Sequence, residues 1–90
     1  QDYHDILGRE DVDGVLLCTA WEHHIDLCID FMKAGKYVGC EVGGAYSVRD
    51  CWKLVETYEE TKVPVMLMEN CIYGRDEMMV ENMVQVIAMI

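Results

Sequence analysis

Polar and aromatic residues collect at three places in this sequence, each directly after a short apolar run. Carboxylates at such places can accept hydrogen bonds, an asparagine amide can both donate and accept them, and a tryptophan can pack on a flat ring. The convergence of these groups is the main functional signal in the chain. The three places are residues 19–24 (TAWEHH), 41–44 (EVGG) and 69–71 (ENC).

Among the candidates, Glu41 is the hardest to explain by a purely structural role. It follows an apolar run, and no helical pattern begins directly after it. We therefore favour a functional role for its carboxylate. Gly43 and Gly44 follow closely. Residues without a side chain let the backbone turn sharply and approach a ligand.

The first of the three places also has structural explanations. Thr19 and Glu22 have the spacing of a capping box, in which each side chain satisfies a free amide at a helix start, and this is compatible with a binding role. His23 and His24 could be metal ligands or residues of a helix surface. Because adjacent helical positions point about 100° apart, the pair is poorly placed for one ion, and we predict no metal site.

Three apolar runs alternate with amphipathic segments, which predicts an α/β fold of three successive strand-helix units around a parallel sheet. Parallel strands end at a common edge, and open sheets of this class bind ligands there. The expected strands are residues 15–19, 37–40 and 65–68. The helices should begin near 19–22, at 47–50 and near 75, and an earlier helix should end at Gly8.

The spacing of apolar residues also predicts what is buried. Continuous apolar strands are typical of sheets covered on both faces. Trp52 is expected to pack rather than to contact a ligand, and the seven methionines should fill a core or an interface. The helix from residue 47 should bury Cys51, Leu54, Val55 and Tyr58, and the last helix should bury Met79, Met83, Val84 and Ile87.

Composition narrows the functional classes. The net charge of −10 argues against nucleic acid and anionic membranes as partners. No apolar run approaches the ~18 residues of a membrane span. Five cysteines, an odd number in apolar segments, predict reduced, buried thiols in a cytoplasmic protein rather than a disulfide framework.

Several motifs together resemble the second half of the nucleotide-binding domain of Gfo/Idh/MocA oxidoreductases, the glucose–fructose oxidoreductase/inositol dehydrogenase family. The resemblance is sharper to one branch, the NAD-dependent glycosidases of glycoside hydrolase family 109. Each motif is weak alone, but together and in register they are fairly specific. They are DGVLLCT (13–19), WEHH (21–24), AGKYV (34–38), EV (41–42), CWKLV (51–55) and MENCIYGR (68–75).

This resemblance implies a partial Rossmann-type sheet. Residues 1–74 would be the C-terminal half of a dinucleotide-binding domain, and residues 75–90 a helix leading toward a substrate domain. The implied cofactor is NAD or NADP, bound on its nicotinamide side. The implied cofactor-binding residues are Thr19, Trp21, Glu22, His23, His24, Glu41, Val42 and Asn70.

Two positions depart from the family pattern. Val42 stands where the broad dehydrogenase family has a lysine that commonly serves the chemistry, which agrees with the glycosidase branch. Gly43 stands where proline is usual, so we expect a looser loop. The sequence has no G-x-G-x-x-G, so the turn that cradles a pyrophosphate is missing, and no residue is assigned a catalytic role.

The sequence thus predicts a fragment of an NAD(P)-dependent oxidoreductase-family protein that acts on a sugar or polyol, and we expect a homo-oligomer. One alternative is a glycosidase, in which a sugar hydroxyl is oxidised by bound NAD, the leaving group is eliminated, water adds and the hydride returns. That route differs from the usual two-carboxylate scheme. Another alternative is a catalytically silent module that pairs with a second copy through exposed sheet edges and apolar faces.

Overall fold

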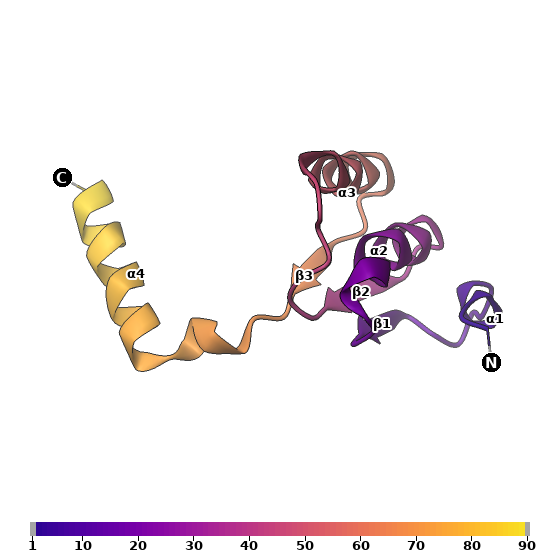
Figure 1. Ribbon diagram of the computed structural model, residues 1–90, viewed down its shortest axis with the longest axis horizontal. Coiled ribbons are helices and arrows are strands. Elements are labelled where there is room, and N and C mark those ends of the chain that lie inside the picture. The colour runs from indigo at the N-terminus through magenta and orange to yellow at the C-terminus, as the bar shows by residue number, and fades with distance from the viewer. Residues whose placement is uncertain (1, 90) are drawn as a thin grey trace.

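Within residues 2–89, which the computed structural model describes, the sheet has three parallel strands in the order β1 (Gly14–Leu17), β2 (Tyr37–Cys40) and β3 (Val65–Leu67). The register places Leu16, Gly39 and Met66 side by side. All three strands run the same way, so their carboxyl ends lie along one edge (Figure 1). The fold is a partial Rossmann-type α/β unit, as predicted.

The helices alternate with these strands. Short 3₁₀ turns follow β1 and β3, at η1 (Trp21–His23) and η2 (Asn70–Tyr73). The predicted second strand is confirmed residue for residue, and so are the helix starts after Ser47 and at Arg75. The α-helices are α1 (His4–Leu7), α2 (His24–Lys33), α3 (Val48–Thr61) and α4 (Arg75–Ala88).

Local signals set the ends of α2 and α3. After α2, Gly35 adopts a φ of +76°, a left-handed conformation that favours glycine. Before α3, the Ser47 side chain accepts a hydrogen bond of 3.1 Å from the Asp50 backbone amide. This satisfies one of the free amides at the start of the helix.

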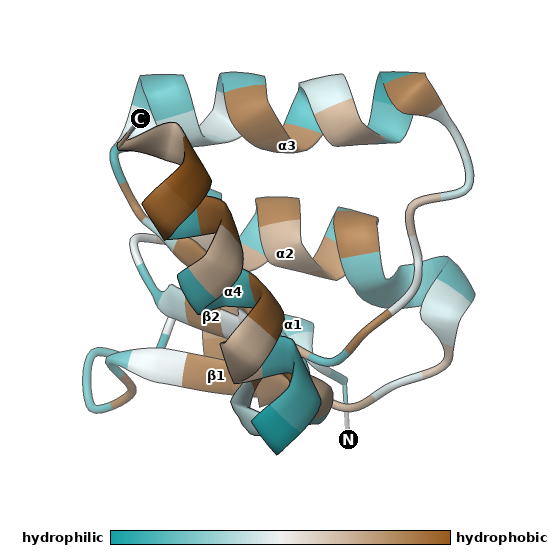
Figure 2. Cartoon of the chain, turned by 90° about the vertical axis from the view of Figure 1, so that its left-hand side faces the viewer, coloured by the Kyte–Doolittle hydropathy of each residue, from teal (hydrophilic) through white to brown (hydrophobic). Residues whose placement is uncertain are grey.

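Helices cover one face of the sheet. Helix α2 packs on β1 and β2, and α3 packs on α2, so sheet, α2 and α3 form successive layers (Figure 2). The core lies between the sheet and α2. It consists of Leu17, Leu27, Cys28, Phe31, Met32, Val38 and Cys40.

The opposite face of the sheet is bare, so the prediction of strands buried on both faces is wrong for this chain. Leu16 is 72% exposed and Met66 is 61% exposed, on either side of Gly39 in the central strand β2. A shallow hollow of about 350 Å³ lies over this face. The apolar pattern of the strands is typical of a sheet covered on both faces, but residues 2–89 cover only one face.

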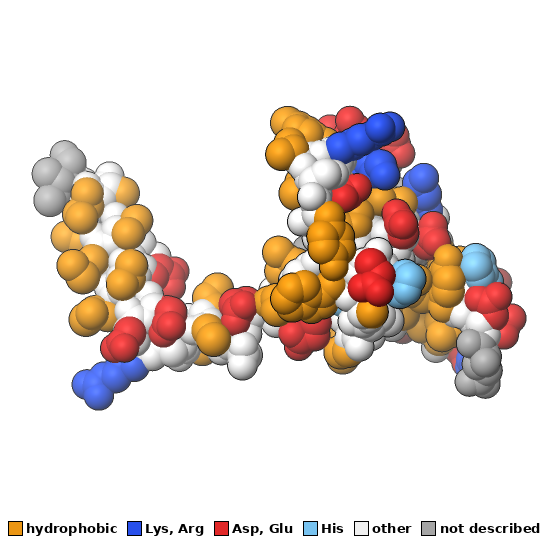
Figure 3. Space-filling model, viewed as in Figure 1, with side chains coloured by type: hydrophobic (Ala, Val, Ile, Leu, Met, Phe, Trp, Pro, Cys, Tyr) orange, Lys and Arg blue, Asp and Glu red, His pale blue; other side chains and the backbone are white. Residues whose placement is uncertain are grey.

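Helix α4 lies apart from the sheet, and its substantial contacts are with η2 (Figure 1). The expected buried stripe of α4 is therefore wrong as a description of this chain. Hydrophobic side chains line the helix in Figure 3, and a hollow of about 780 Å³ runs along them. Met79, Met83, Val84 and Ile87 are all exposed.

Two further burial predictions need correction. On α3, Leu54 is the half-buried residue of the expected stripe, whereas Cys51, Val55 and Tyr58 are exposed, and so is Trp52. Among the cysteines, Cys28 and Cys40 are buried, whereas Cys18, Cys51 and Cys71 are exposed. All five are free thiols, as predicted.

Two long-range contacts fasten the N-terminal segment. The Tyr3 hydroxyl donates to the Asp30 carboxylate at 2.9 Å, which joins α1 to α2. The buried Lys36 amine donates to the carbonyl oxygens of Arg9 and Val12 at 2.5 and 2.8 Å. Over the same described residues, no helix is both long and apolar enough to cross a bilayer.

Candidate functional site

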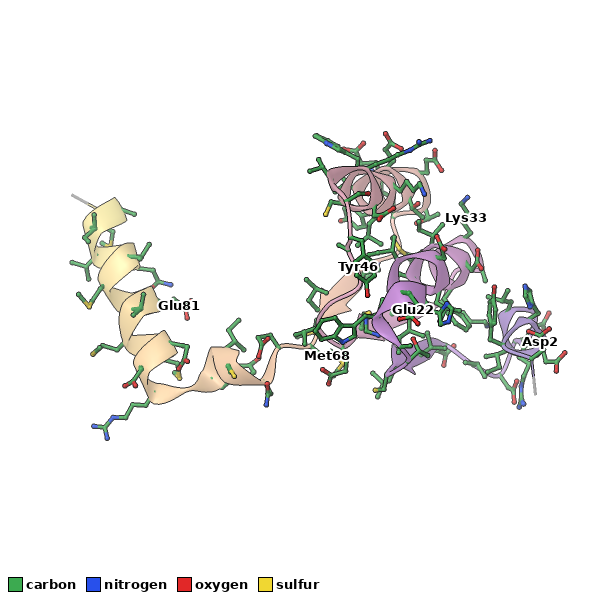
Figure 4. All side chains as sticks on the ribbon, viewed as in Figure 1. Asp2, Glu22, Lys33, Tyr46, Met68 and Glu81 are labelled. Atoms are coloured by element: carbon green, nitrogen blue, oxygen red, sulfur yellow. The ribbon has the colours of Figure 1, made fainter. Side chains whose placement is uncertain are left out.

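The three polar segments leave the sheet side by side. Beyond the strand ends, the Glu41 amide donates to the Leu17 carbonyl at 3.0 Å, and the Met68 amide donates to the Cys40 carbonyl at 2.8 Å. These bonds continue the parallel pairing past the strands. In Figure 4 the labelled Glu22, Tyr46 and Met68 belong to the segments that leave the strands, whereas Glu81 on α4 lies well apart.

The segment after β1 does not form the expected capping box. Ala20 is extended, and the chain then makes one 3₁₀ turn, closed by a bond from the His23 amide to the Ala20 carbonyl. The Thr19 hydroxyl points to the Ala20 carbonyl instead of capping a helix amide. Thr19 lies too early in the chain for the role, because η1 intervenes before α2 begins at His24.

Trp21 packs against the glycines that follow β2. Gly43 and Gly44 have φ values of +90° and +96°, so the sharp turn predicted for this loop is confirmed. A Cβ atom on Gly43 would lie 2.5 Å from Cδ2 of the Trp21 ring, so the bare backbone is what admits the ring. Trp21 is 56% exposed, which leaves much of the indole open to a ligand.

His24 lies behind this contact and is only 1% exposed. Its Nε2 lies 3.1 Å from the Thr19 carbonyl oxygen, and its Nδ1 lies 3.3 Å from the Gly43 carbonyl oxygen. Both ring nitrogens therefore face backbone groups, one in each of the first two segments.

Glu41 presents an exposed carboxylate at the end of β2. Its Oε2 accepts a 3.4 Å hydrogen bond from the Val42 amide, and among the residues that the structure describes Glu41 forms no ion pair. The Cys40 thiol donates to the Glu41 carbonyl at 3.3 Å. The backbone of Glu41 is thus held on both sides while its carboxylate has free acceptor positions.

Glu41 and Asn70 line the same hollow, of about 260 Å³. Asn70 begins η2, and the preceding Glu69 caps that turn by accepting from the Cys71 amide at 2.9 Å. The Glu69 carboxylate also raises the pKa of the Cys71 thiol. The hollow therefore combines carboxylate oxygens and a side-chain amide with an apolar lining.

The structure groups the predicted residues into two neighbouring sets. Glu41 and Asn70 share the hollow, whereas Trp21 does not line it and lies on the Gly43 loop instead. Thr19, Glu22, His23 and Val42 are exposed near these loops. Sequence reasoning placed Glu69 in the third polar segment without naming it as a cofactor residue, and it missed the apolar lining of the hollow, which includes Met66, Met68 and Ile72.

The electrostatics of this edge favour neutral hydroxyl and amide ligands over phosphates. Glu22, Glu41 and Glu69 are all acidic, and a carboxylate accepts hydrogen bonds that hydroxyl groups donate. No group of three or more His, Cys, Asp or Glu side chains in the described part of the chain is placed to hold a metal ion.

Comparison with known proteins gives a consistent result. A glycosyl hydrolase family 109 protein of Shewanella pealeana is 47% identical over 85 residues, which are 94% of this chain and 19% of that protein. The chain thus spans about a fifth of the length of this curated relative.

Solved structures share the fold. An NAD-binding protein from Listeria innocua is 25% identical with a TM-score of 0.82, over 98% of this chain and 25% of that chain. The WlbA dehydrogenase from Bordetella pertussis, solved in complex with NADH and UDP-GlcNAcA, is 20% identical with a TM-score of 0.82, over 93% of this chain and 26% of that chain. The latter likeness shows the fold alone.

The family match covers the whole sheet and the first two segments of its carboxyl edge, and it ends at Glu69. Residues 1–69, well over half of the chain, match the oxidoreductase family with an NAD-binding Rossmann fold. The parallel sheet, the polar edge and this match agree, and the chain belongs to the Gfo/Idh/MocA oxidoreductase family.

Proposed function

We propose that this chain forms the nicotinamide side of an NAD(P) site in a protein that acts on a sugar or polyol. The observation that supports this most directly is the hollow shared by Glu41 and Asn70 beside the Trp21 loop. Parallel α/β sheets bind their ligands at this edge.

The residues present fit that half of the cofactor. Glu41 has free carboxylate oxygens for ribose hydroxyls, and the Asn70 amide can pair with a carboxamide. The open side of the Trp21 ring can pack on a flat group. Bound NAD supplies the hydride chemistry, and this chain's residues bind and orient it.

Two reactions remain candidates for the whole protein. The name of the 47% identical relative supports a glycosidase, and Val42 in place of the family's lysine agrees with it. The family itself supports a single hydride transfer between nicotinamide and a sugar alcohol. Both reactions place a sugar or polyol next to the nicotinamide.

Cofactor binding is tested by NADH titration of the chain in a Trp52→Phe background, which leaves Trp21 as the sole tryptophan. We expect quenching of Trp21 emission with a dissociation constant below the millimolar range. Glu41→Gln should weaken binding roughly tenfold, because a charged acceptor for hydroxyl groups is lost. The matched control is Glu81→Gln on the distant α4.

Absence of any NADH response would contradict the proposed site, and equal effects of Glu41→Gln and Glu81→Gln would remove Glu41 from it. For the intact protein, a synthetic glycoside separates the two reactions. Release of the leaving group without net NADH formation indicates the glycosidase, whereas steady NADH accumulation indicates the dehydrogenase.

A second candidate function is that of a silent module that associates with another copy. The bare sheet face around Leu16 and Met66 and the apolar side chains of α4 favour it. Exposed apolar surface of this extent is typical of an interface. This candidate requires no ligand and predicts self-association instead.

A further inference from the structure

His24 is placed to act on the cofactor edge without touching a ligand. It is the first residue of α2 and almost fully buried, so its ring is closed to solvent. Both ring nitrogens already face partners: Nε2 faces the Thr19 carbonyl at 3.1 Å, and Nδ1 faces the Gly43 carbonyl at 3.3 Å.

The two partners belong to different segments of the edge. Thr19 lies just before Trp21, in the segment after β1, and Gly43 lies just after Glu41, in the segment after β2. A carbonyl oxygen can only accept, so a ring N–H must donate wherever one of these bonds is made. One imidazole ring thus spans the gap between the loops that carry Trp21 and Glu41.

Steric contacts reinforce this tie. A Cβ atom on Gly44 would lie 2.5 Å from Cβ of His24 and 2.6 Å from the Trp21 carbonyl oxygen. The loop after β2 therefore rests directly on His24 and on the backbone of Trp21. Its position depends on what occupies the place of the His24 ring.

We propose that His24 is a positioning residue that sets the spacing between Trp21 and Glu41, because its buried ring fills the space between the two loops and donates its N–H to the carbonyl oxygen of Thr19 or of Gly43. In this proposal His24 affects cofactor binding indirectly, by holding the two loops in place, and not by contacting the cofactor itself. The consequence for cofactor binding rests on the function proposed above. The tie between the loops does not.

The experiment compares three variants in the Trp52→Phe background. His24→Leu keeps a bulky side chain but has no donor, whereas His24→Gln retains an amide that can donate to a carbonyl oxygen. Leu27→Ala, in the core on the same helix, is the control for general destabilisation. Readouts are Trp21 emission and near-UV circular dichroism, NADH affinity, thermal unfolding, and the ¹⁵N resonances of the His24 ring.

In the unmutated chain, we expect a His24 ring N–H that exchanges slowly with solvent, as a buried and bonded group does. His24→Leu should shift Trp21 emission and weaken NADH binding roughly five- to tenfold, the cost of about one hydrogen bond. His24→Gln should restore much of both signals. Leu27→Ala should lower the unfolding temperature while leaving Trp21 emission unchanged in the folded state.

Fast solvent exchange of both ring nitrogens in the unmutated chain would overturn the proposal, even if His24→Leu failed to fold. Unchanged Trp21 signals in a folded His24→Leu variant, or no rescue by His24→Gln, would overturn it as well. If the chain binds no NADH but Trp21 still responds to His24→Leu and recovers in His24→Gln, the tie stands and the proposed cofactor function fails.

Discussion

Gly43 shows how one missing side chain shapes the edge of the sheet. Its φ of +90° lies in a region that side chains disfavour, and a Cβ atom would collide with the Trp21 ring. The family's proline would also be incompatible there, since proline fixes φ near −65°. The glycine therefore permits both the turn and the stacking of Trp21.

We expect Gly43→Ala to lower the free energy of unfolding by about 1–3 kcal/mol, the cost of a strained backbone conformation, and to shift Trp21 emission. Urea unfolding and fluorescence measure both effects. Gly8→Ala is the control, because a Cβ atom at Gly8 meets nothing within 4 Å and its φ is −88°. Similar losses in the two variants would refute the steric argument.

The buried thiol of Cys28 makes stability depend on alkaline pH. Burial raises the pKa of Cys28 from 9.0 to about 12. Between these values the unfolded thiol has lost its proton while the folded thiol keeps it, so the free energy of unfolding falls as pH rises. Well below pH 9 both states are protonated and the contribution of Cys28 to the free energy of unfolding is constant.

We therefore expect the unfolding free energy to fall between pH 9 and pH 11, measured by urea titration, and to fall less steeply in Cys28→Ala. The comparison uses slopes, since the alanine also leaves a cavity. Cys51→Ala, at an exposed thiol, is the control. Identical slopes in all three proteins would contradict the assignment to Cys28.

Among the helices and strands, α3 offers the clearest test of whether a single capping residue stabilises a helix start. The Ser47 hydroxyl oxygen accepts from the Asp50 amide, and removal of such a cap costs about 1 kcal/mol. We expect Ser47→Ala to lose about that amount in urea unfolding and Ser47→Asp to retain most of it. Equal stability of the alanine variant would mean that α3 is held by packing on α2 alone.

Strands, helix boundaries and the glycine turn could be predicted because their causes lie within a few residues. Ser47 caps a helix that begins at the next residue, whereas Thr19 has the same pattern and fails because η1 intervenes. Burial was predicted less well. The apolar spacing around Leu16 and Met79 shows which face of the strand or helix is apolar, but it does not show whether another part of the chain packs on that face, and here none of the described residues does.

In the candidate site, too, some features could be predicted from the sequence and others could not. Glu41 and Asn70 were predictable because parallel strand ends must share an edge. The separation of Trp21 from their hollow was not predictable, and neither was the position of the His24 ring between two carbonyl oxygens. Both features depend on how the loop after β1 packs against the loop after β2. The spacing of residues within one loop does not predict its contacts with the other loop.

The whole molecule exposes apolar surface on both the sheet and α4, and self-association is the expected result. We expect sedimentation to show concentration-dependent oligomers and Met66→Glu to shift them toward monomer, because it places a charge on the bare sheet face. Val48→Glu, at an exposed apolar site on α3, is the control. A chain that stays monomeric at high concentration would exclude the module function.

The chemical reactivity of the buried Lys36 amine should report local unfolding of the N-terminal segment that covers it. Lys33, Lys53 and Lys62 are exposed and should be acylated freely by a small reagent. Lys36, sealed against the Arg9 and Val12 carbonyls, should react only when the N-terminal segment lifts away. Mass spectrometry of the Lys36 peptide would then report the opening rate in the native state, with three built-in references in the same chain.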